Sequence, residues 1–215
     1  MHLTKYGHSC VRFDDGDRSL VIDPGAFSDV AAALDGVGAV LITHEHFDHL
    51  DQERVRSALA GDPSLRLFAP SSITAGLAEF GEQVVTVAPD EAFTADGFSV
   101  RTFGGQHAVI HPQIPVIANV GYLIDGAVFH PGDSFTVPPV AVDTLLLPAQ
   151  APWSKVSEVI DYAISVRAPR VLPIHDHLVI DAYHGVLRGN LAAVAGPFGV
   201  SLESFDETIT VQAQP

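Results

Sequence analysis

The feature that most constrains this chain is a cluster of metal-binding residue types at the end of a predicted buried strand. The run from Val37 to Thr43 is apolar and rich in β-forming residues, and it leads directly into His44, His46, Asp48 and His49. Beyond the cluster, apolar residues recur at helical spacing. A strand that ends in four potential ligands and is followed by a helix predicts a metal site at the edge of a sheet.

The local geometry of this cluster predicts how its members divide. Residues two apart in an extended chain point to the same side, so His44 and His46 can bind one ion. Asp48 and His49 lie where the chain begins to coil, and they can reach a second ion. The alternative is a polar turn whose histidines only cap the helix, but that reading leaves the density of ligands unexplained.

The rest of the chain indicates hairpins in its first part and alternating strands and helices later. Strands are predicted up to residue 13 and over 19–22, 37–43, 65–69, 84–87, 98–103, 116–124, 127–130, 142–147, 171–174 and 208–211. Helices are predicted over 30–34, where Ser28 is the expected cap, and over 48–60, 72–80, 157–166 and 182–194. This order favours an α/β fold built as a four-layer α/β/β/α sandwich, and we expect a single domain over residues 1–215.

Charge and composition exclude several classes of function. The chain carries 26 Asp+Glu against 11 Lys+Arg, a formal net charge of −15, and its basic residues are scattered. Nucleic acid and anionic membranes are therefore not expected partners. Cys10 is the single cysteine and is expected to be a small buried residue, so no intramolecular disulfide can form. Without an apolar stretch of ~18 residues or a signal-like start, a cytoplasmic protein is expected.

The pattern His-x-His-x-Asp-His resembles the signature of the metallo-β-lactamase superfamily. Further motifs of that superfamily occur in the expected order and at predicted strand ends. They are Asp23 before Pro24, a histidine after a mid-chain strand, Gly132-Asp133-Ser134, and Pro173-Ile174-His175. The resemblance covers nearly the whole chain and implies the α/β/β/α fold and a metal-dependent hydrolase.

The resemblance also implies a set of metal ligands. The first metal would be held by His44, His46 and His107, the second by Asp48, His49 and His175, and Asp133 would bridge the two. Three protein ligands per ion, a shared carboxylate and a shared water leave open positions where a substrate can displace solvent. Two divalent metal ions are therefore expected, with zinc as the first choice and manganese or iron as alternatives.

Two histidines compete for the third position on the first metal. His107 follows the predicted strand 98–103 directly, and the pair Gly104-Gly105 allows the chain to turn back sharply. His111 lies farther along the loop and precedes Pro112, which favours an extended backbone that leads away from the strand end. The sequence therefore predicts His107 as the ligand.

The expected mechanism follows from the metals. They lower the pKa of a bound water from ~15.7 towards ~7, which supplies a hydroxide without a serine or cysteine nucleophile. In the scheme usual for the resembled superfamily, Asp48 also contacts this water, so a catalytic role in handling protons is predicted for it. The formal charge of the loaded site, about +1, favours an anionic small molecule or an oxyanion formed during the reaction.

Other residues are expected around the metals rather than on them. Asp23 is predicted to fix the tautomer of a liganding histidine. His8 belongs to a Gly-His-Ser element that resembles the branch containing ascorbate-phosphate lactonases, and it is expected to line the pocket. His111 and His130 are candidates for supporting or pocket roles, and Trp153 can pack on a substrate or in the core.

The favoured function is thus a small hydrolase of the lactonase-like branch that cleaves an ester, a lactone or a phosphodiester. The runner-up is a persulfide dioxygenase with a single iron, since that activity also occurs on the resembled scaffold. A metal-binding module without catalysis is the third reading. The oligomeric state is left open, although oligomers are common in the resembled branch and a homo-oligomer would fit it.

Overall fold

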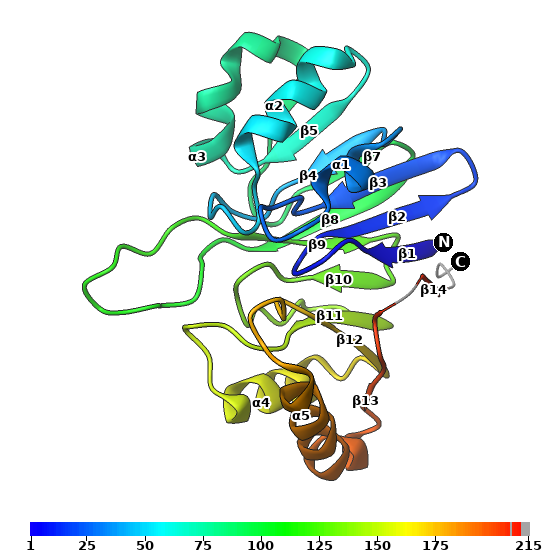
Figure 1. Cartoon of the computed structure of the whole chain (residues 1–215), viewed down its shortest axis with the longest axis vertical. Helices are drawn as coiled ribbons and strands as arrows, with labels where there is room; N and C mark the ends of the chain where they lie inside the picture. Colours follow the sequence, from blue (N-terminus) through cyan, green and yellow to red (C-terminus); the bar gives the residue numbers. More distant parts are fainter. Residues whose placement is uncertain (207, 212–215) are drawn as a thin grey trace.

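A computed structural model describes residues 1–206 and 208–211 of the chain. Two sheets lie face to face in the middle of the molecule, and helices cover the outer face of each sheet (Figure 1). In this view α2 and α3 lie at one end, and α4 and α5 lie at the other. The four-layer α/β/β/α sandwich predicted from the sequence is confirmed.

The first sheet comes mainly from the first part of the chain. Its strands lie in the order β14-β1-β2-β3-β4-β5-β6, so the last described strand returns to pair with the first. The strands are β14 (Ile209–Thr210), β1 (His2–Lys5), β2 (Val11–Asp15), β3 (Arg18–Ile22), β4 (Ala39–Leu41), β5 (Arg66–Ala69) and β6 (Val84–Thr86). From β3 to β6 neighbouring strands are parallel.

The second sheet follows the chain without a reversal in order, from β7 to β13. Its strands are β7 (Ala92–Ala95), β8 (Phe98–Gly104), β9 (Val120–Ile124), β10 (Val128–His130), β11 (Thr144–Pro148), β12 (Arg170–Ile174) and β13 (Ser201–Leu202). Strands β7 to β10 are antiparallel, and β10 to β13 are parallel.

The helices fill the connections between parallel strands. They are α1 (Val30–Leu34), α2 (Gln52–Gly61), α3 (Ser71–Thr74), the 3-10 helix η1 (Ala75–Gln83), α4 (Val156–Val166), α5 (Asp181–Val194) and the 3-10 helix η2 (Gly196–Phe198). In the described part of the chain no helix is long and apolar enough to cross a bilayer.

Alternation along the strands explains the layers. In β3, Leu20 and Ile22 belong to the core between the sheets, whereas Val21 packs in the core beneath α1 and α2. In β11, Leu146 faces the other sheet while Leu145 packs towards α4. Because successive side chains point to opposite faces, a strand that is apolar throughout is buried on both sides.

Strand direction places the predicted ligands at one edge of the two sheets. The loops after β3 and β4 carry Asp23 and the segment 44–49, and the loop after β12 begins with His175. His107 follows β8, and Asp133 follows β10. Parallel strands bring their carboxyl ends to the same edge, so residues from five distant segments meet there.

Several local predictions need correction. Asp29, not Ser28, caps α1, and its carboxylate accepts from the backbone N–H of Ala32 at 3.2 Å. Ser28 instead donates to the carbonyl oxygen of Gly7 at 3.1 Å. The helix predicted over 72–80 is instead the short α3 followed by η1, and the backbone leaves helical geometry within η1 at Leu77 and at Gly81.

Two short strands, β7 and β13, were not predicted. The Asp96-Gly97 pair between β7 and β8 has positive φ at both residues, the conformation typical of tight hairpin turns. That dipeptide could have identified β7. The strand predicted over 116–124 begins only at Val120, so residues 105–119 form a long loop.

Candidate metal centre

Three histidines form what we call the first cluster: His44, His46 and His107. The Nε2 atom of His44 lies 3.1 Å from Nδ1 of His46. The ring of His107 is centred 4.9 Å from that of His44 and 4.7 Å from that of His46. The Nδ1–H of His107 donates to the carbonyl oxygen of Ala108 at 2.6 Å, which leaves Nε2 directed at the cluster.

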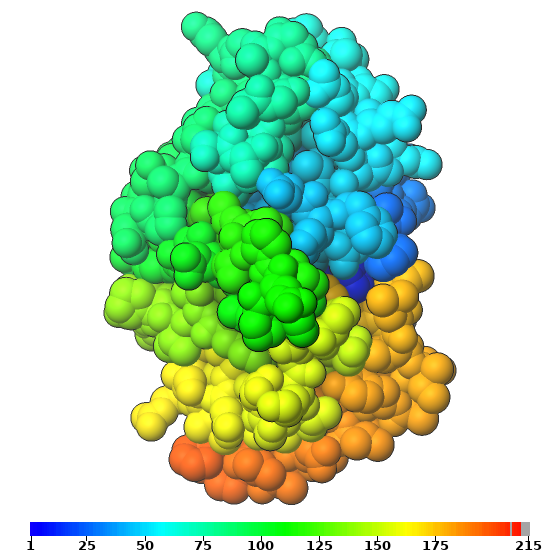
Figure 2. Space-filling model, turned by 90° about the vertical axis from the view of Figure 1, so that its left-hand side faces the viewer, coloured from blue at the N-terminus to red at the C-terminus, as the bar shows by residue number. Residues whose placement is uncertain are grey.

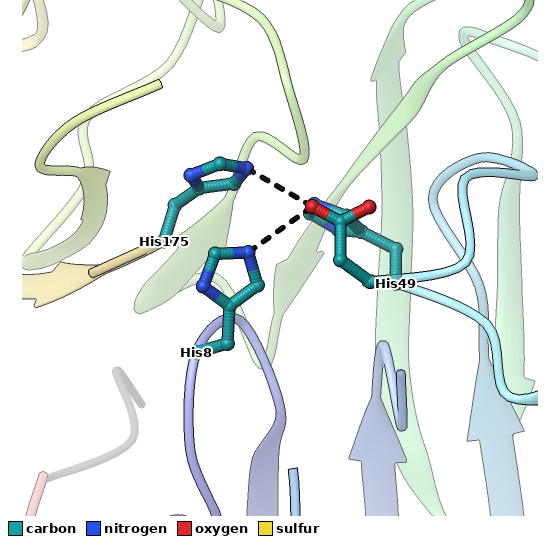
Figure 3. Close-up of side chains that lie close together, drawn as sticks. His8, His49 and His175 are labelled. Atoms are coloured by element: carbon teal, nitrogen blue, oxygen red, sulfur yellow. Dashed lines mark hydrogen bonds and ion pairs between the residues drawn. The ribbon is translucent and has the colours of Figure 1, made fainter. Parts of the chain in front are cut away.

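Four residues form the second cluster: His8, Asp48, His49 and His175. The carboxylate Oδ2 of Asp48 lies 3.3 Å from Nε2 of His8 and 3.6 Å from Nε2 of His175. Figure 3 shows the rings of His8 and His175 turned towards the same place beside His49. The Nδ1–H of His175 donates to the carbonyl oxygen of Gln150 at 2.6 Å, so its Nε2 faces inwards.

Asp133 lies between the two clusters and contacts both. Its Oδ1 is 3.1 Å from Nε2 of His49, and its Oδ2 is 3.3 Å from Nε2 of His107 and 3.2 Å from Nε2 of His175. The side chain is almost fully buried. This is the position expected of a carboxylate that bridges two ions.

Three neighbours hold Asp133 in place. Asn119 is buried, accepts from the backbone N–H of Asp133 at 2.9 Å and donates to the carbonyl oxygen of Pro131 at 2.8 Å. Trp153 donates its indole N–H to Oδ2 of Asp133 at 2.9 Å. Gly132 has φ +63, and a Cβ there would lie 2.2 Å from Oδ1 of Asn119, so the turn requires glycine.

Asp23 supports both clusters from behind. It accepts from the backbone N–H and the hydroxyl of Thr43 at 2.8 and 2.7 Å, and from Nδ1–H of His49 at 2.7 Å. Because the hydroxyl proton of Thr43 is used on Asp23, its oxygen accepts from Nδ1–H of His44 at 2.9 Å. Both histidines therefore present Nε2 to the interior, and His49 is the histidine whose tautomer Asp23 fixes directly.

The buried donor set fits metal ions. Within the described residues, Nε2 of His49, Nε2 of His107 and Oδ1 of Asp133 are buried without a hydrogen-bond partner. Each histidine donates its Nδ1 proton elsewhere, so in the neutral ring the Nε2 lone pair faces a carboxylate lone pair at 3.1 or 3.3 Å. Buried acceptors that face one another are unfavourable unless a positive charge lies between them, and a divalent cation supplies it.

The protonation of the metal-free site differs between the clusters. Burial, together with repulsion from His49, lowers the pKa of His44 well below its usual value, and burial also lowers the pKa of His46. Burial also opposes the charged form of His49, but attraction from Asp133 and Asp23 outweighs it and raises the pKa well above the usual range.

The remaining titratable residues of the second cluster are also perturbed. For His175, burial is outweighed by hydrogen bonds to Asp133 and Asp48, which raise its pKa to about 9. The pKa of Asp48 is lowered despite burial, because His175 and His8 donate to its carboxylate. Burial lowers the pKa of His8. A proton thus occupies in the metal-free protein a position that suits a cation.

The family follows from comparison with known proteins. The family described as the beta-lactamase superfamily domain matches residues 2–175. The chain belongs to the metallo-β-lactamase superfamily. A relative from Mycobacterium tuberculosis, Protein Rv0786c, is 40% identical over 196 residues, which cover 89% of this chain and 91% of the relative.

A further relative and a solved structure of similar fold carry the word hydrolase in their names. A relative from Aeropyrum pernix, named UPF0173 metal-dependent hydrolase, is 26% identical over 149 residues and 61% of each chain. The solved structure of Igni18, described as a novel metallo hydrolase from Ignicoccus hospitalis, aligns with a TM-score of 0.73 at 19% identity over 98% of this chain and 99% of that one. This member of the superfamily is a metal-dependent hydrolase.

The structure brings most of the predicted site residues together. All seven predicted ligands lie in the two clusters or between them, and their ligand atoms form groups within 4.8 Å. His111 is exposed, and its Nδ1 accepts from the backbone N–H of Gln113, so it lies outside both clusters. His130 is buried behind Asp23 and donates Nε2–H to the carbonyl oxygen of Ser9 at 3.0 Å.

Two residues that hold the ligands in place were not predicted from the sequence. Asn119 and Thr43 are buried polar residues whose side chains are fully used in holding Asp133, Asp23 and His44. Trp153, expected to pack on a substrate or in the core, has its ring 4.9 Å from that of Phe135 and also donates its indole N–H to Asp133. Only the position of Asn119 inside the predicted apolar strand 116–124 hinted at a buried amide.

Loops border the site formed by the two clusters. Figure 2 shows the segment between β8 and β9, residues 105–119, lying across the middle of one face between the two halves of the molecule. It exposes Val109 and Ile114, and Phe47 projects from the metal motif itself with 63% of its surface exposed. A hollow of about 340 Å³ adjoins His8 and His177.

Proposed function

We propose that this chain is a two-metal hydrolase that cleaves an ester, a lactone or a phosphodiester in a small molecule. The observation that carries the proposal is the position of Asp133, whose two carboxylate oxygens reach histidines of both clusters within 3.1 to 3.3 Å. A site for a single ion would not need one buried carboxylate to serve two sets of ligands.

The ligands in this proposal are divided by their contacts. His44, His46 and His107 would hold one ion, Asp48, His49 and His175 would hold the other, and Asp133 would bridge them. Zinc suits the mixture of imidazole and carboxylate ligands, with manganese or iron as alternatives. When bound, the two ions would lower the pKa of a water towards ~7 and polarise the bond under attack.

The residues of the chain have separate tasks in this scheme. The side chain of Asp48 is 16% exposed, compared with 4% for Asp133, so Asp48 is the carboxylate that substrate and solvent can reach. It is therefore the residue we assign to handling the proton of the reaction. Asp23 and Thr43 fix the tautomers of His49 and His44, so that both present Nε2 to the ions.

The branch and the setting belong to the same proposal. The Gly7-His8-Ser9 element supports the branch that includes ascorbate-phosphate lactonases, because His8 lies in the second cluster. An anionic substrate, a cytoplasmic location and assembly into a homo-oligomer remain predictions.

Metal counting combined with a substrate screen tests the proposal. Metal-free protein would be reloaded with zinc, manganese or ferrous iron, and the ions per chain measured by mass spectrometry. Each form would then be assayed on p-nitrophenyl acetate, γ-butyrolactone and bis(p-nitrophenyl) phosphate, with the metal-free protein as control. We expect about two ions per chain and turnover of at least one bond class.

Other outcomes would contradict the proposal in different ways. A single iron per chain, with oxygen consumed and sulfite formed from glutathione persulfide, would identify a dioxygenase instead. Two ions per chain without turnover of any of the three bond types would remove the proposed substrate classes.

A further inference from the structure

His8 is held by contacts on every side. Its side chain is buried, its ring lies 4.1 Å from that of His175, and the edge of its ring meets Phe27 at 5.4 Å. Its backbone has φ +46, a left-handed conformation that is uncommon for residues other than glycine. Its carbonyl oxygen accepts from the backbone N–H of His175 at 3.1 Å. The ring orientation is therefore fixed by the fold.

The hydrogen bonds of the ring determine which nitrogen carries the proton. The backbone N–H of His177 points at Nδ1 of His8 at 3.3 Å, and a backbone N–H can only donate. Nδ1 is consequently the acceptor, and in the neutral ring the proton lies on Nε2. That Nε2 faces Oδ2 of Asp48 at 3.3 Å, where it finds an acceptor.

This arrangement distinguishes His8 from the other histidines of the site. His107 and His175 donate their Nδ1 proton to a carbonyl oxygen, and His49 donates its own to Asp23. With Nδ1 used in this way, the neutral form of each of these three rings has its lone pair on Nε2, as a metal ligand must. His8 has the opposite arrangement, although its Nε2 is close enough to the other atoms of the second cluster to be counted among possible ligands.

We propose that His8 is a positioning residue and not a fourth ligand of the second metal: it donates Nε2–H to Asp48 and thereby orients that carboxylate. The inference rests on the proposed two-metal site. The second ion then has Asp48, His49, His175 and the shared Asp133 as its protein ligands.

The tautomer of His8 can be read directly by NMR. Uniformly ¹⁵N-labelled, zinc-loaded protein would be examined by long-range ¹H–¹⁵N correlation of the histidine rings, with the His8→Gln variant used to assign the signals. We expect His8 to show a protonated Nε2 and an unprotonated Nδ1. A proton on Nδ1 together with a zinc-bound Nε2 would overturn the proposal.

Substitution supplies a second, independent test. His8→Gln keeps an N–H donor that can reach Asp48, whereas His8→Ala does not, and both variants place a residue without a ring at the same backbone angle. His2→Gln, on the exposed face of β1, is the matched control. Zinc affinity would be measured by competition with a chromogenic chelator, and ligand number by the visible spectrum of the cobalt-loaded protein.

A positioning role predicts a specific pattern. His8→Ala should weaken the second zinc by roughly 10–100-fold, as is typical when a partner of a ligand is lost, and His8→Gln should recover most of that loss. The cobalt spectrum should be unchanged in His8→Gln. Equal loss of one ion in both variants, with an altered cobalt spectrum, would identify His8 as a ligand. A single zinc in the wild-type protein would instead contradict the proposed function. The NMR experiment would still report which nitrogen of His8 carries the proton, whatever the number of zinc ions.

Discussion

The first cluster and the second cluster contain the same kind of ring, yet they differ in the charges around it. In the first cluster, burial and neighbouring histidines lower the pKa values of His44 and His46. In the second cluster, carboxylates surround the rings and raise the pKa values of His49 and His175. The distribution of carboxylates, and not the residue type, decides which nitrogens are free to bind a metal.

The difference teaches how the proposed two-metal site would be loaded in order. A ring that is already neutral gives its lone pair to an ion without competition, whereas a ring that holds a proton must release it first. The first cluster should therefore accept a metal readily at neutral pH, and the second should depend on pH and on Asp133. Five predictions test this comparison.

Asp133→Ala should have the largest effect, because it removes the carboxylate that contacts both clusters. Hydrolysis should fall well beyond the ~10–100-fold loss typical of an outer contact, and at least one ion should be lost. Metal content and turnover would be compared with those of Asp17→Ala, an exposed aspartate in the β2–β3 turn. Wild-type metal content and activity in Asp133→Ala would refute a bridging role.

The pH dependence of zinc affinity should have the next largest effect and should differ between the two clusters. In the metal-free protein His175, with a pKa of about 9, and His49 carry protons at neutral pH. For each proton that the metal must displace, metal affinity falls about tenfold for every unit by which the pH drops below the pKa. Zinc titration followed by calorimetry should therefore show a second ion bound roughly 100-fold or more weakly at pH 6 than at pH 8. Equal pH dependence for both ions would show that the clusters do not differ.

The same shift predicts how the stability of the metal-free fold changes with pH. The folded pKa of His175 is raised above the ordinary value of 6.5, so its stabilising contribution is complete below pH 6.5 and is lost as the pH rises through about 9. The thermal midpoint of metal-free protein should fall between pH 7 and pH 10. Zinc-loaded protein, in which the proton is already displaced, should lack that component.

His107→Ala should remove a ligand of the first cluster without touching the second. We expect zinc affinity at one site to fall by more than ~10–100-fold while the pH-dependent site is retained. His111→Ala, in the same loop but exposed, is the control and should bind zinc like the wild type. The opposite result, with loss in His111→Ala alone, would mean that the wrong histidine was chosen.

Trp153→Phe should give the smallest effect, because it removes one hydrogen bond to Asp133 and keeps an aromatic ring. Zinc affinity should fall by roughly tenfold, at the lower end for an outer contact. Tyr162→Phe, which removes a donor to Thr136 instead, is the matched control. The chain has one tryptophan, so its fluorescence should also change when zinc is added. An unchanged signal would indicate that Trp153 does not contact the loaded site.

Much of the fold could be predicted because its signals are local. The apolar strands β4, β11 and β12 and the amphipathic helix α4 are visible as runs and periods in the sequence. The edge strands β7 and β13 were missed because, unlike the equally short β6 and β14, they contain no run of β-branched residues. The cap of α1 was misplaced because Ser28 and Asp29 are both good capping residues.

The site divides in the same way. His44, His46, Asp48 and His49 could be found from spacing, and Asp133 and His175 from resemblance to a superfamily. The contacts of Asn119, Thr43 and Trp153 could not, because each joins segments that are far apart in sequence and depends on the register of two sheets. The orientation of His8 depends on the backbone of His177, which no pattern in the sequence predicts.

The order of the ligands along the chain also has a consequence in time. Ribosomal synthesis begins at the N-terminus, so His8 and residues 44–49 emerge long before Asp133 and His175. At ~5–20 residues per second, the stretch from His49 to His175 takes roughly 6 to 25 s to make. During that interval the growing chain offers four adjacent ligands without the carboxylate and the histidine that complete the pair of sites. In the proposed site, secure metal acquisition would therefore be a late event of biosynthesis, and the choice among available metals would fall to the finished fold instead of the nascent peptide.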